Sequence, residues 1–165
     1  MYSSIVVGTD GSPTARRAVM EAIRLAGAVG AALHVVSAYE PLRGTRIVGA
    51  PEGAAKVWSV APDAEVQRIV EEAVARARMD GVKARAHTLT GDPAAALLAI
   101  AEQEHADLIV VGSLGMHGVR RVLGSVPNKV SHNARCSVLI ASTEATSLPD
   151  EEHAAAASGD SASMS

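Results

Sequence analysis

The chain has 165 residues, of which 48% are hydrophobic, 20% charged and only 2% aromatic, and its formal net charge is −3. These values are typical of one globular domain, and so few aromatic residues argue against a module that stacks single-stranded nucleic acid on aromatic side chains. The single cysteine, Cys136, excludes a disulfide framework and a cysteine-based zinc site. No apolar run approaches the roughly 20 residues that span a bilayer. The N-terminal residues do not form a signal-peptide pattern, so we expect a cytoplasmic protein.

Five β-rich segments alternate with helical patterns along the chain. A hydroxyl N-cap followed by proline, Ser12-Pro13, is typical of a helix start. The predicted order is strand 4–8, a helix from Ser12-Pro13, strand 33–38, helix 63–80, strand 82–89, a helix from Asp92-Pro93, strand 108–111, helix 125–134 and strand 138–140. This order predicts an α/β fold, with a mostly parallel sheet covered by helices on both faces. The strand over 82–89 alternates only weakly and is expected near an edge of the sheet.

Two segments do not fit this pattern. Residues 39–61 have no clear periodicity and contain several prolines and glycines, so they are either a functional lid or a poorly ordered loop. From Glu144 onward the chain has five acidic residues and no lysine or arginine, and it is rich in alanine and serine. Such a segment cannot bury enough apolar surface to order itself. We therefore predict one domain over residues 1–143 and a disordered acidic tail over 144–165.

Two strand ends have residues suited to binding. In open α/β sheets, ligands bind beyond the carboxyl ends of the strands, where the strand order reverses. The first strand runs into Gly8-Thr9-Asp10-Gly11-Ser12, and the fourth runs into glycines 112, 115 and 118 and then Gly124-Ser125 at a helix start. Glycines let backbone approach a ligand, and a helix start presents N–H groups to an anion. The alternative is that the glycines only shape a connection and Asp10 only hydrogen-bonds its own turn.

Taken together, these segments resemble the universal stress protein family over about residues 2–143. The resemblance is carried by IVVGTDGS at 5–12, ADLIVVG at 106–112, GSVPNKVS at 124–131 and CSVLI at 136–140. It implies a three-layer αβα fold of the Rossmann-like, adenine nucleotide alpha hydrolase-like type, with a five-stranded parallel sheet in the order 3-2-1-4-5. The nucleotide-binding branch carries Gly-x2-Gly-x9-Gly-Ser/Thr. Gly112, Gly115, Gly124 and Ser125 match it, except that eight residues separate Gly115 from Gly124.

The resemblance implies that an adenine nucleotide, either ATP with Mg²⁺ or alternatively cAMP, binds between the first and fourth strands. The implied site residues are Gly8, Thr9, Asp10, Ala38, Val111, Gly112, Gly115, Gly124, Ser125 and Val126. Thr9 and Asp10 would lie near the ribose and phosphates, with Asp10 as a candidate Mg²⁺ ligand. Ala38 would meet adenine through its backbone.

The resemblance also implies a role in the stress response. The protein would be a sensor or regulator, with at most very slow ATP hydrolysis. It would form a homodimer through its last strand, Ser137 to Ala141, and an exposed apolar edge strand favours pairing with another chain. No nucleic-acid or membrane partner is expected. The alternative, from a different class, is a dimeric interaction module that binds no nucleotide.

The chain lacks the sequence motifs of other common α/β domains. A P-loop needs Gly-Lys-Ser/Thr, a dinucleotide site needs G-x-G-x-x-G after the first strand, and a receiver domain needs an aspartate after the third. The histidines outside the glycine loop are His34, His87, His105, His132 and His153. They show no i,i+4 pair and no metal-ligand spacing, so no histidine metal site is predicted. His117 is expected to face solvent and Cys136 to be a buried apolar residue.

Overall fold

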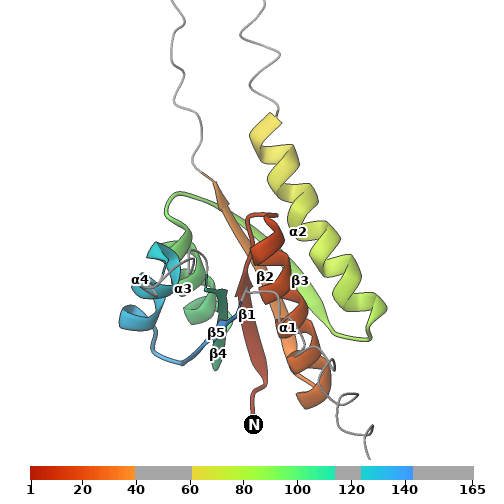
Figure 1. The fold of residues 1–165 in the computed structure, drawn as a ribbon. Coiled ribbons are helices and arrows are strands. Elements are labelled where there is room, and N and C mark those ends of the chain that lie inside the picture. Colours follow the sequence, from red (N-terminus) through yellow and green to blue (C-terminus); the bar gives the residue numbers. More distant parts are fainter. Residues whose placement is uncertain (40–60, 114–123, 143–165) are drawn as a thin grey trace, which may run out of the picture.

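A five-stranded parallel sheet forms the middle layer of the molecule (Figure 1). The structure is a computed structural model that describes residues 1–39, 61–113 and 124–142. The strands are β1 (Ser4–Gly8), β2 (Ala32–Tyr39), β3 (Ala84–Thr90), β4 (Leu108–Gly112) and β5 (Ser137–Ala141). They pair in the order β3-β2-β1-β4-β5, and every pairing is parallel. The fold class and the strand order are therefore confirmed, with β3 at one edge.

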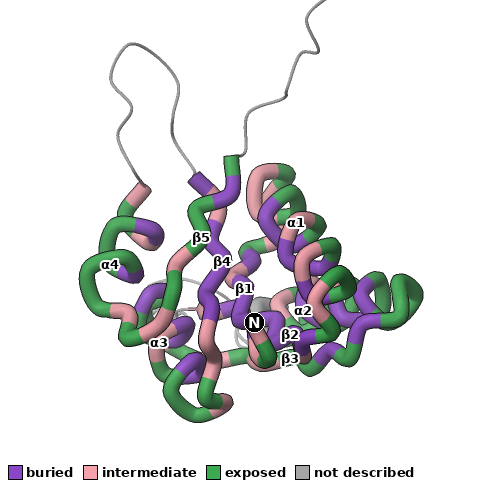
Figure 2. Tube along the Cα trace, turned by 90° about the horizontal axis from the view of Figure 1, so that it is seen from below, coloured by how far each residue is buried: buried purple, intermediate pink, exposed green. Residues whose placement is uncertain are grey.

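Two helices cover each face of the sheet. They are α1 (Pro13–Val29) and α2 (Ala61–Met79) on one face, and α3 (Pro93–Gln103) and α4 (Ser125–Asn133) on the other. Figure 2 shows these two layers on opposite sides of the buried strands. In the described part of the chain, none of these helices has both the length and the apolar character needed to cross a membrane. Residues 40–60 and the whole predicted tail, 144–165, lie outside the described residues, and so does His117.

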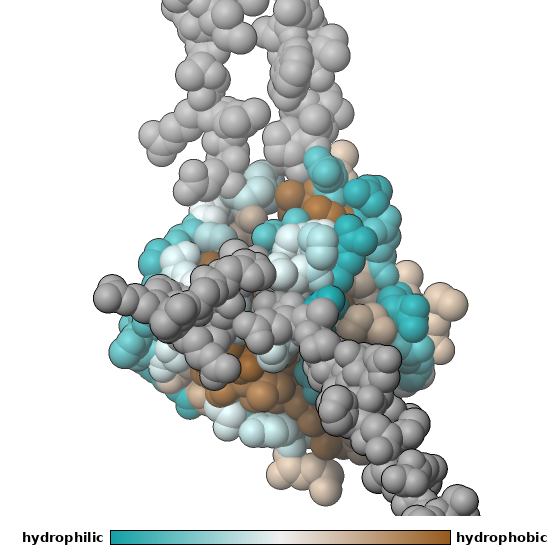
Figure 3. All heavy atoms as spheres, in the orientation of Figure 1, coloured by the Kyte–Doolittle hydropathy of each residue, from teal (hydrophilic) through white to brown (hydrophobic). Residues whose placement is uncertain are grey.

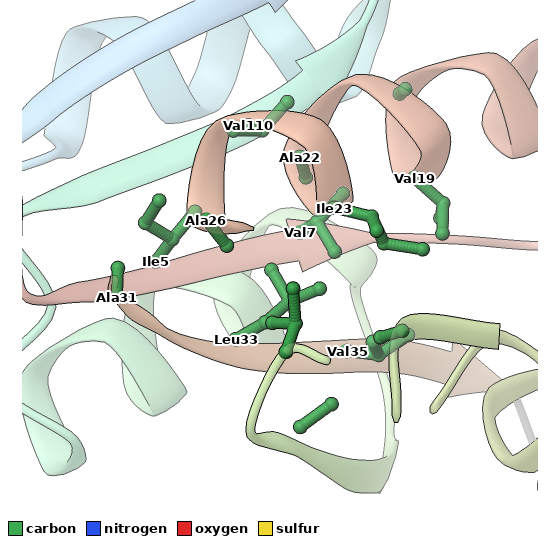
Figure 4. Close-up of a cluster of buried hydrophobic side chains, with 14 of the residues drawn as sticks. Ile5, Val7, Val19, Ala22, Ile23, Ala26, Ala31, Leu33, Val35 and Val110 are labelled. Carbon is green, nitrogen blue, oxygen red and sulfur yellow. The ribbon is translucent and has the colours of Figure 1, made fainter. Parts of the chain in front are cut away.

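Side-chain alternation along the strands divides the core into two clusters. In β1, Ile5 and Val7 belong to the cluster on the face covered by α1 and α2, whereas Val6 belongs to the cluster on the face covered by α3 and α4. Figure 4 shows the first cluster, in which Ile23 of α1 lies against the sheet side chains. Both faces of the central strands are buried, which explains why their sequences are continuously apolar.

Short-range hydrogen bonds set the helix starts that flank the strand ends. The Ser12 hydroxyl accepts a hydrogen bond from the backbone N–H of Ala15 at 3.2 Å, and the Asp92 carboxylate accepts one from Ala95 at 3.0 Å. Both helices have proline in their first turn. The sequence-based prediction of these two starts is confirmed.

One aspartate connects the beginning of the central strand, β1, to the beginning of its neighbour β4. Asp107, just before β4, accepts hydrogen bonds from the backbone N–H and the hydroxyl of Ser3, both at 2.8 Å, and from the Ser4 N–H at 3.3 Å. Burial opposes ionisation of this carboxyl, but the hydrogen bonds outweigh burial and lower the pKa of Asp107. The ionised carboxylate therefore fixes β1 against β4 at their amino ends.

Candidate functional site

A cavity lies at the carboxyl ends of the central strands β1 and β4, from which the chain continues to opposite faces of the sheet. The helix after β1 packs on one face of the sheet and the helix after β4 on the other, so a crevice opens between the two strand ends. The cavity has a volume of about 170 Å³. Its lining comprises Gly8, Thr9, Asp10, Thr14, Ala15, Val36, Ala38, Pro93, Leu97, Val111, Gly112, Gly124, Ser125, Val126 and Pro127.

The structure brings nine of the ten residues singled out from the sequence to this cavity. They are Gly8, Thr9, Asp10, Ala38, Val111, Gly112, Gly124, Ser125 and Val126. Gly115, the tenth, lies outside the described residues. Segments more than 100 positions apart in the sequence thus line one cavity, as expected for parallel strands that end at the same edge of a sheet.

Several apolar residues of the lining were missed. Val36 lies two positions before Ala38 on β2 and therefore projects from the same face of the sheet, a periodicity that could have revealed it. Pro93 and Leu97 come from α3, and nothing in their spacing distinguishes them from ordinary core residues. With Val126 and Pro127 of α4, these side chains give the cavity an apolar wall.

Close packing explains the glycine at the end of β1. A Cβ atom at Gly8 would lie 3.1 and 3.3 Å from the two methyl carbons of Leu97. Ordinary carbon–carbon contacts are about 3.5–4.0 Å. The absence of a side chain at Gly8 therefore lets α3 approach the sheet and keeps the cavity open beside Leu97.

The turn after β1 gives the cavity a polar rim. Thr9 is buried; its backbone N–H donates to the Val36 carbonyl at 2.9 Å, and its hydroxyl oxygen accepts from the Gly11 N–H at 3.2 Å. Asp10 is exposed, and its Oδ1 accepts a hydrogen bond from the Ser12 N–H at 2.9 Å. One oxygen of Asp10 thus serves its own turn, which leaves Oδ2 as the atom that could reach a metal ion.

The start of α4 supplies backbone donors. Its N-cap, Gly124, has an extended conformation (φ −57°, ψ 162°), and no side chain caps this helix. The N–H groups of Ser125 and Val126 precede the first intrahelical hydrogen bond, which runs from the Asn128 N–H to the Gly124 carbonyl at 3.1 Å. Pro127 has no N–H. An anion in the cavity would therefore meet two backbone donors at the positive end of a helix.

An ion pair connects the two helices that form this wall. Lys129 of α4 contacts Asp92, the N-cap of α3, with Nζ 2.7 Å from Oδ2. The hydrogen bond from Lys129 is the main cause that lowers the pKa of the Asp92 carboxyl, and the backbone N–H of Ala95 adds to it. The pair links α3 and α4 beside the cavity, in addition to the apolar side chains through which the two helices pack.

A second cluster of polar side chains lies at the other end of α3. His34 of β2 and His87 of β3 are hydrogen-bonded, with 3.0 Å between Nδ1 of His34 and Nε2 of His87. Glu104, at the C-terminus of α3, places Oε2 3.9 Å from Nδ1 of His34. Spacing along one element does not detect this arrangement, because its members come from three elements. That these histidines bind no metal stays a prediction from the sequence.

The comparisons with known proteins agree with this architecture. A family model described as "Universal stress protein family" matches residues 1–142. The chain belongs to the universal stress protein family. Universal stress protein Rv1636 of Mycobacterium tuberculosis is 40% identical over 148 residues, which cover 86% of this chain and 97% of that protein. Universal stress protein MJ0531 of Methanocaldococcus jannaschii is 34% identical over 142 residues, which cover 85% of this chain and 82% of the relative.

Solved structures of this family include nucleotide complexes. A universal stress protein crystallised in complex with cAMP is 34% identical to this chain, with a TM-score of 0.68, and the match covers 87% of this chain and 98% of the other. A universal stress protein from Archaeoglobus fulgidus in complex with dAMP is 25% identical, with a TM-score of 0.60, and the match covers 84% and 97% of the two chains. Both ligands are adenine nucleotides.

Proposed function

We propose that this universal stress protein binds an adenine nucleotide in the cavity between β1 and β4. The observation that carries the proposal is the pairing of an apolar pocket with an uncapped helix start inside one crevice. The nucleotide complexes of the two structural relatives support the same ligand class. The glycine motif favours ATP, and cAMP is the alternative.

The two ends of such a nucleotide match two parts of the lining. A cavity of about 170 Å³ compares with the ~150 Å³ cavity that holds a benzene ring, so it accommodates a base and not a whole nucleotide. Adenine would therefore pack against Val36, Ala38 and Leu97, with the ribose near Thr9. The phosphate would lie at the N–H groups of Ser125 and Val126, and Oδ2 of Asp10 would reach a Mg²⁺ ion.

The proposed role is binding rather than turnover. Asp10 is the one titratable side chain among the described residues that line the cavity, and its Oδ1 is engaged in the turn. Hydrolysis of a phosphate at a useful rate requires a group that orients the attacking water and positive charges that stabilise the transferred phosphoryl group. The described lining of the cavity has no lysine or arginine. We therefore place the protein among nucleotide-dependent sensors or regulators. The stress-response role and the cytoplasmic location remain predictions from the sequence.

A homodimer through β5 is the second part of the proposal. Leu139 and Ile140 of this edge strand are each 36% exposed. Figure 3 shows a hydrophobic area on the face where Figure 1 places β4 and β5. Pairing of two β5 edges would cover this apolar surface. The same surface is the observation that favours the alternative function, a dimeric interaction module without nucleotide.

The experiment that tests nucleotide binding starts from the purified full chain. The protein is denatured, any released nucleotide is identified by chromatography, and the nucleotide-free protein is titrated calorimetrically with adenosine, AMP, ATP and cAMP. Binding of the phosphorylated compounds in the micromolar range supports the proposal. Failure to bind any of the four, together with an empty purified protein, contradicts it and favours the interaction module.

A pair of substitutions locates the phosphate. Ser125→Pro removes the N–H of the first helical residue, and the extended conformation of Gly124 is compatible with a following proline. Ser125→Ala removes only the hydroxyl and serves as the matched control. We expect Ser125→Pro to weaken AMP binding by about tenfold, which corresponds to about 1.4 kcal/mol, while adenosine binding stays within twofold of wild type. Equal effects on AMP and adenosine would place the phosphate elsewhere.

A further inference from the structure

The cluster of His34, His87 and Glu104 lies outside the nucleotide cavity and is built from three separate elements. In the parallel pairing of β2 with β3, His34 is the partner of Arg85. His87 follows Arg85 by two positions and so projects from the same face of the sheet as His34. Glu104 approaches this face from the C-terminal end of α3, and its backbone carbonyl accepts a hydrogen bond from the Ser4 hydroxyl at 3.2 Å.

The three side chains converge on one point. One ring nitrogen of each histidine and one carboxylate oxygen of Glu104 all lie within 4.8 Å of one another. Two imidazole nitrogens and a carboxylate are a recurrent ligand set for zinc, with bond lengths of about 2.0–2.2 Å. Tetrahedral bonds of that length separate ligand atoms by about 3.3 Å.

The movements needed for binding are small. Against that spacing of about 3.3 Å, the two histidine nitrogens at 3.0 Å need to separate by about 0.3 Å, and Glu104 at 3.9 Å from Nδ1 of His34 needs to approach by about 0.6 Å. The third pair, His87 and Glu104, lies within 4.8 Å and needs to close by at most about 1.5 Å. Side-chain rotations supply these shifts, because the backbone positions are already set by the β2–β3 register and by the end of α3. We propose that His34, His87 and Glu104 bind a divalent transition-metal ion, with Zn²⁺ the ion that this ligand set favours.

The surroundings of the cluster suit a cation. Burial lowers the pKa of both His34 and His87, although the carboxylate of Glu104 opposes that shift. One of the two facing ring nitrogens carries the proton of their hydrogen bond, so binding an ion requires that ring to hold its proton on its other nitrogen. Arg85 is the competing positive charge, with Nη1 4.0 Å from Oε2 of Glu104, and its side chain is 75% exposed. This contact is long and the guanidinium extends into solvent, so Arg85 can move away as an ion binds.

An ion can reach the cluster from solvent. His34, Arg85 and Glu104 line an open cleft at the amino end of β2, together with residues of the α2–β3 connection. Three protein ligands leave a fourth tetrahedral position, which would face this cleft and hold water. Because β3 is the edge strand, the ion would join it to β2 and α3 and so stabilise that edge.

The test uses the full chain, freed of any affinity tag and treated with EDTA. Zn²⁺ is titrated calorimetrically, and Co²⁺ is added in parallel because its visible absorption reports four-coordinate geometry. We expect one Zn²⁺ per chain and, with free Zn²⁺ at about 100 times its Kd, a rise in Tm of about 5–10 °C. The absence of Zn²⁺ uptake by the wild-type chain at micromolar concentrations would overturn the proposal.

Substitutions identify the ligands. His87→Gln and Glu104→Gln keep the size of each side chain, and both should weaken Zn²⁺ binding by about 100-fold, since even the loss of an outer-shell partner costs 10–100-fold. His132→Gln, at an exposed histidine of α4, is the matched control and should bind Zn²⁺ as wild type does. Unchanged Zn²⁺ affinity in folded His87→Gln and Glu104→Gln proteins, or a loss in His132→Gln, would assign the ion to other residues. The Tm of each variant without metal shows whether it is folded.

Discussion

Replacement of Gly8 by valine should close the nucleotide cavity while leaving the chain folded. The added Cβ would lie 3.1 and 3.3 Å from the Leu97 methyl carbons, so the end of the Leu97 side chain has to retreat by about 0.5 Å to restore ordinary contact. Leu97 lines the cavity and can move into it. Gly8→Val therefore mainly fills the cavity and strains the backbone little.

The structure gives the expected size of the loss of stability and of the loss of nucleotide affinity in Gly8→Val. Overpacking costs about 1–3 kcal/mol, and the space beside Leu97 places Gly8→Val at about 1–2 kcal/mol, which lowers Tm by about 2–8 °C in a chain of this length. The three carbon atoms of the valine side chain, each taken as about the size of a water molecule (~30 Å³), would fill about half of the 170 Å³ cavity. A purine ring no longer fits, so we expect nucleotide affinity to fall by about 100-fold or more.

The measurement pairs calorimetric titration with thermal unfolding, and a second glycine supplies the control. A Cβ at Gly27 in α1 would make an ordinary 3.5 Å contact with Val82, and alanine is favoured over glycine in a helix by about 1 kcal/mol. Gly27→Ala should therefore raise Tm by about 2–4 °C and leave nucleotide affinity unchanged. Wild-type affinity in a folded Gly8→Val protein would refute the assignment of the cavity, and an equal loss in Gly27→Ala would show that the effect is not local.

Three further outcomes are expected. Asp107→Asn should lower the free energy of unfolding by about 1–3 kcal/mol in urea titrations at pH 7. Because the folded pKa of Asp107 is lowered, its contribution is complete above about pH 5 and is lost as the pH falls through the folded pKa, so the two proteins should converge in acid. Asp10→Asn keeps an acceptor for the Ser12 N–H but removes the charge, and it should weaken ATP binding about tenfold in Mg²⁺ and little in EDTA. Leu139→Asp on β5 should shift the chain to monomer in sedimentation, and a dimer of unchanged stability would place the interface elsewhere.

Local sequence patterns were sufficient to predict the elements and the two helix caps. The Ser12-Pro13 and Asp92-Pro93 starts depend on contacts three residues apart, and continuous apolar strands depend on burial of both sheet faces. The strand order came from the resemblance, because the alternation of strands and helices is compatible with several orders. Once β1 and β4 are neighbours, the glycine turns after them must lie at one edge, and this is why nine of the ten expected residues line the cavity.

The remaining parts of the site depend on packing that sequence spacing does not encode. In the sequence, Leu97 cannot be distinguished from the other apolar residues of α3. It lines the cavity because the absence of a side chain at Gly8 lets α3 lie close to β1. The boundaries of α2 and β3 moved by two residues at their starts, from 63 to Ala61 and from 82 to Ala84. These shifts change the length of each element and not the pairing register of β3, which depends on contacts with β2 that spacing along the sequence does not encode.

The histidine cluster shows how much depends on that register. His34 and His87 are 53 positions apart and meet only because β2 and β3 pair with His34 opposite Arg85. A β3 register shifted by one residue would direct His87 to the α1–α2 face, where the first core cluster is apolar. In the observed register His87 instead faces α3, whose C-terminal end carries Glu104. The metal proposal therefore follows from strand pairing, and its test by His87→Gln examines the register as well as the ligand.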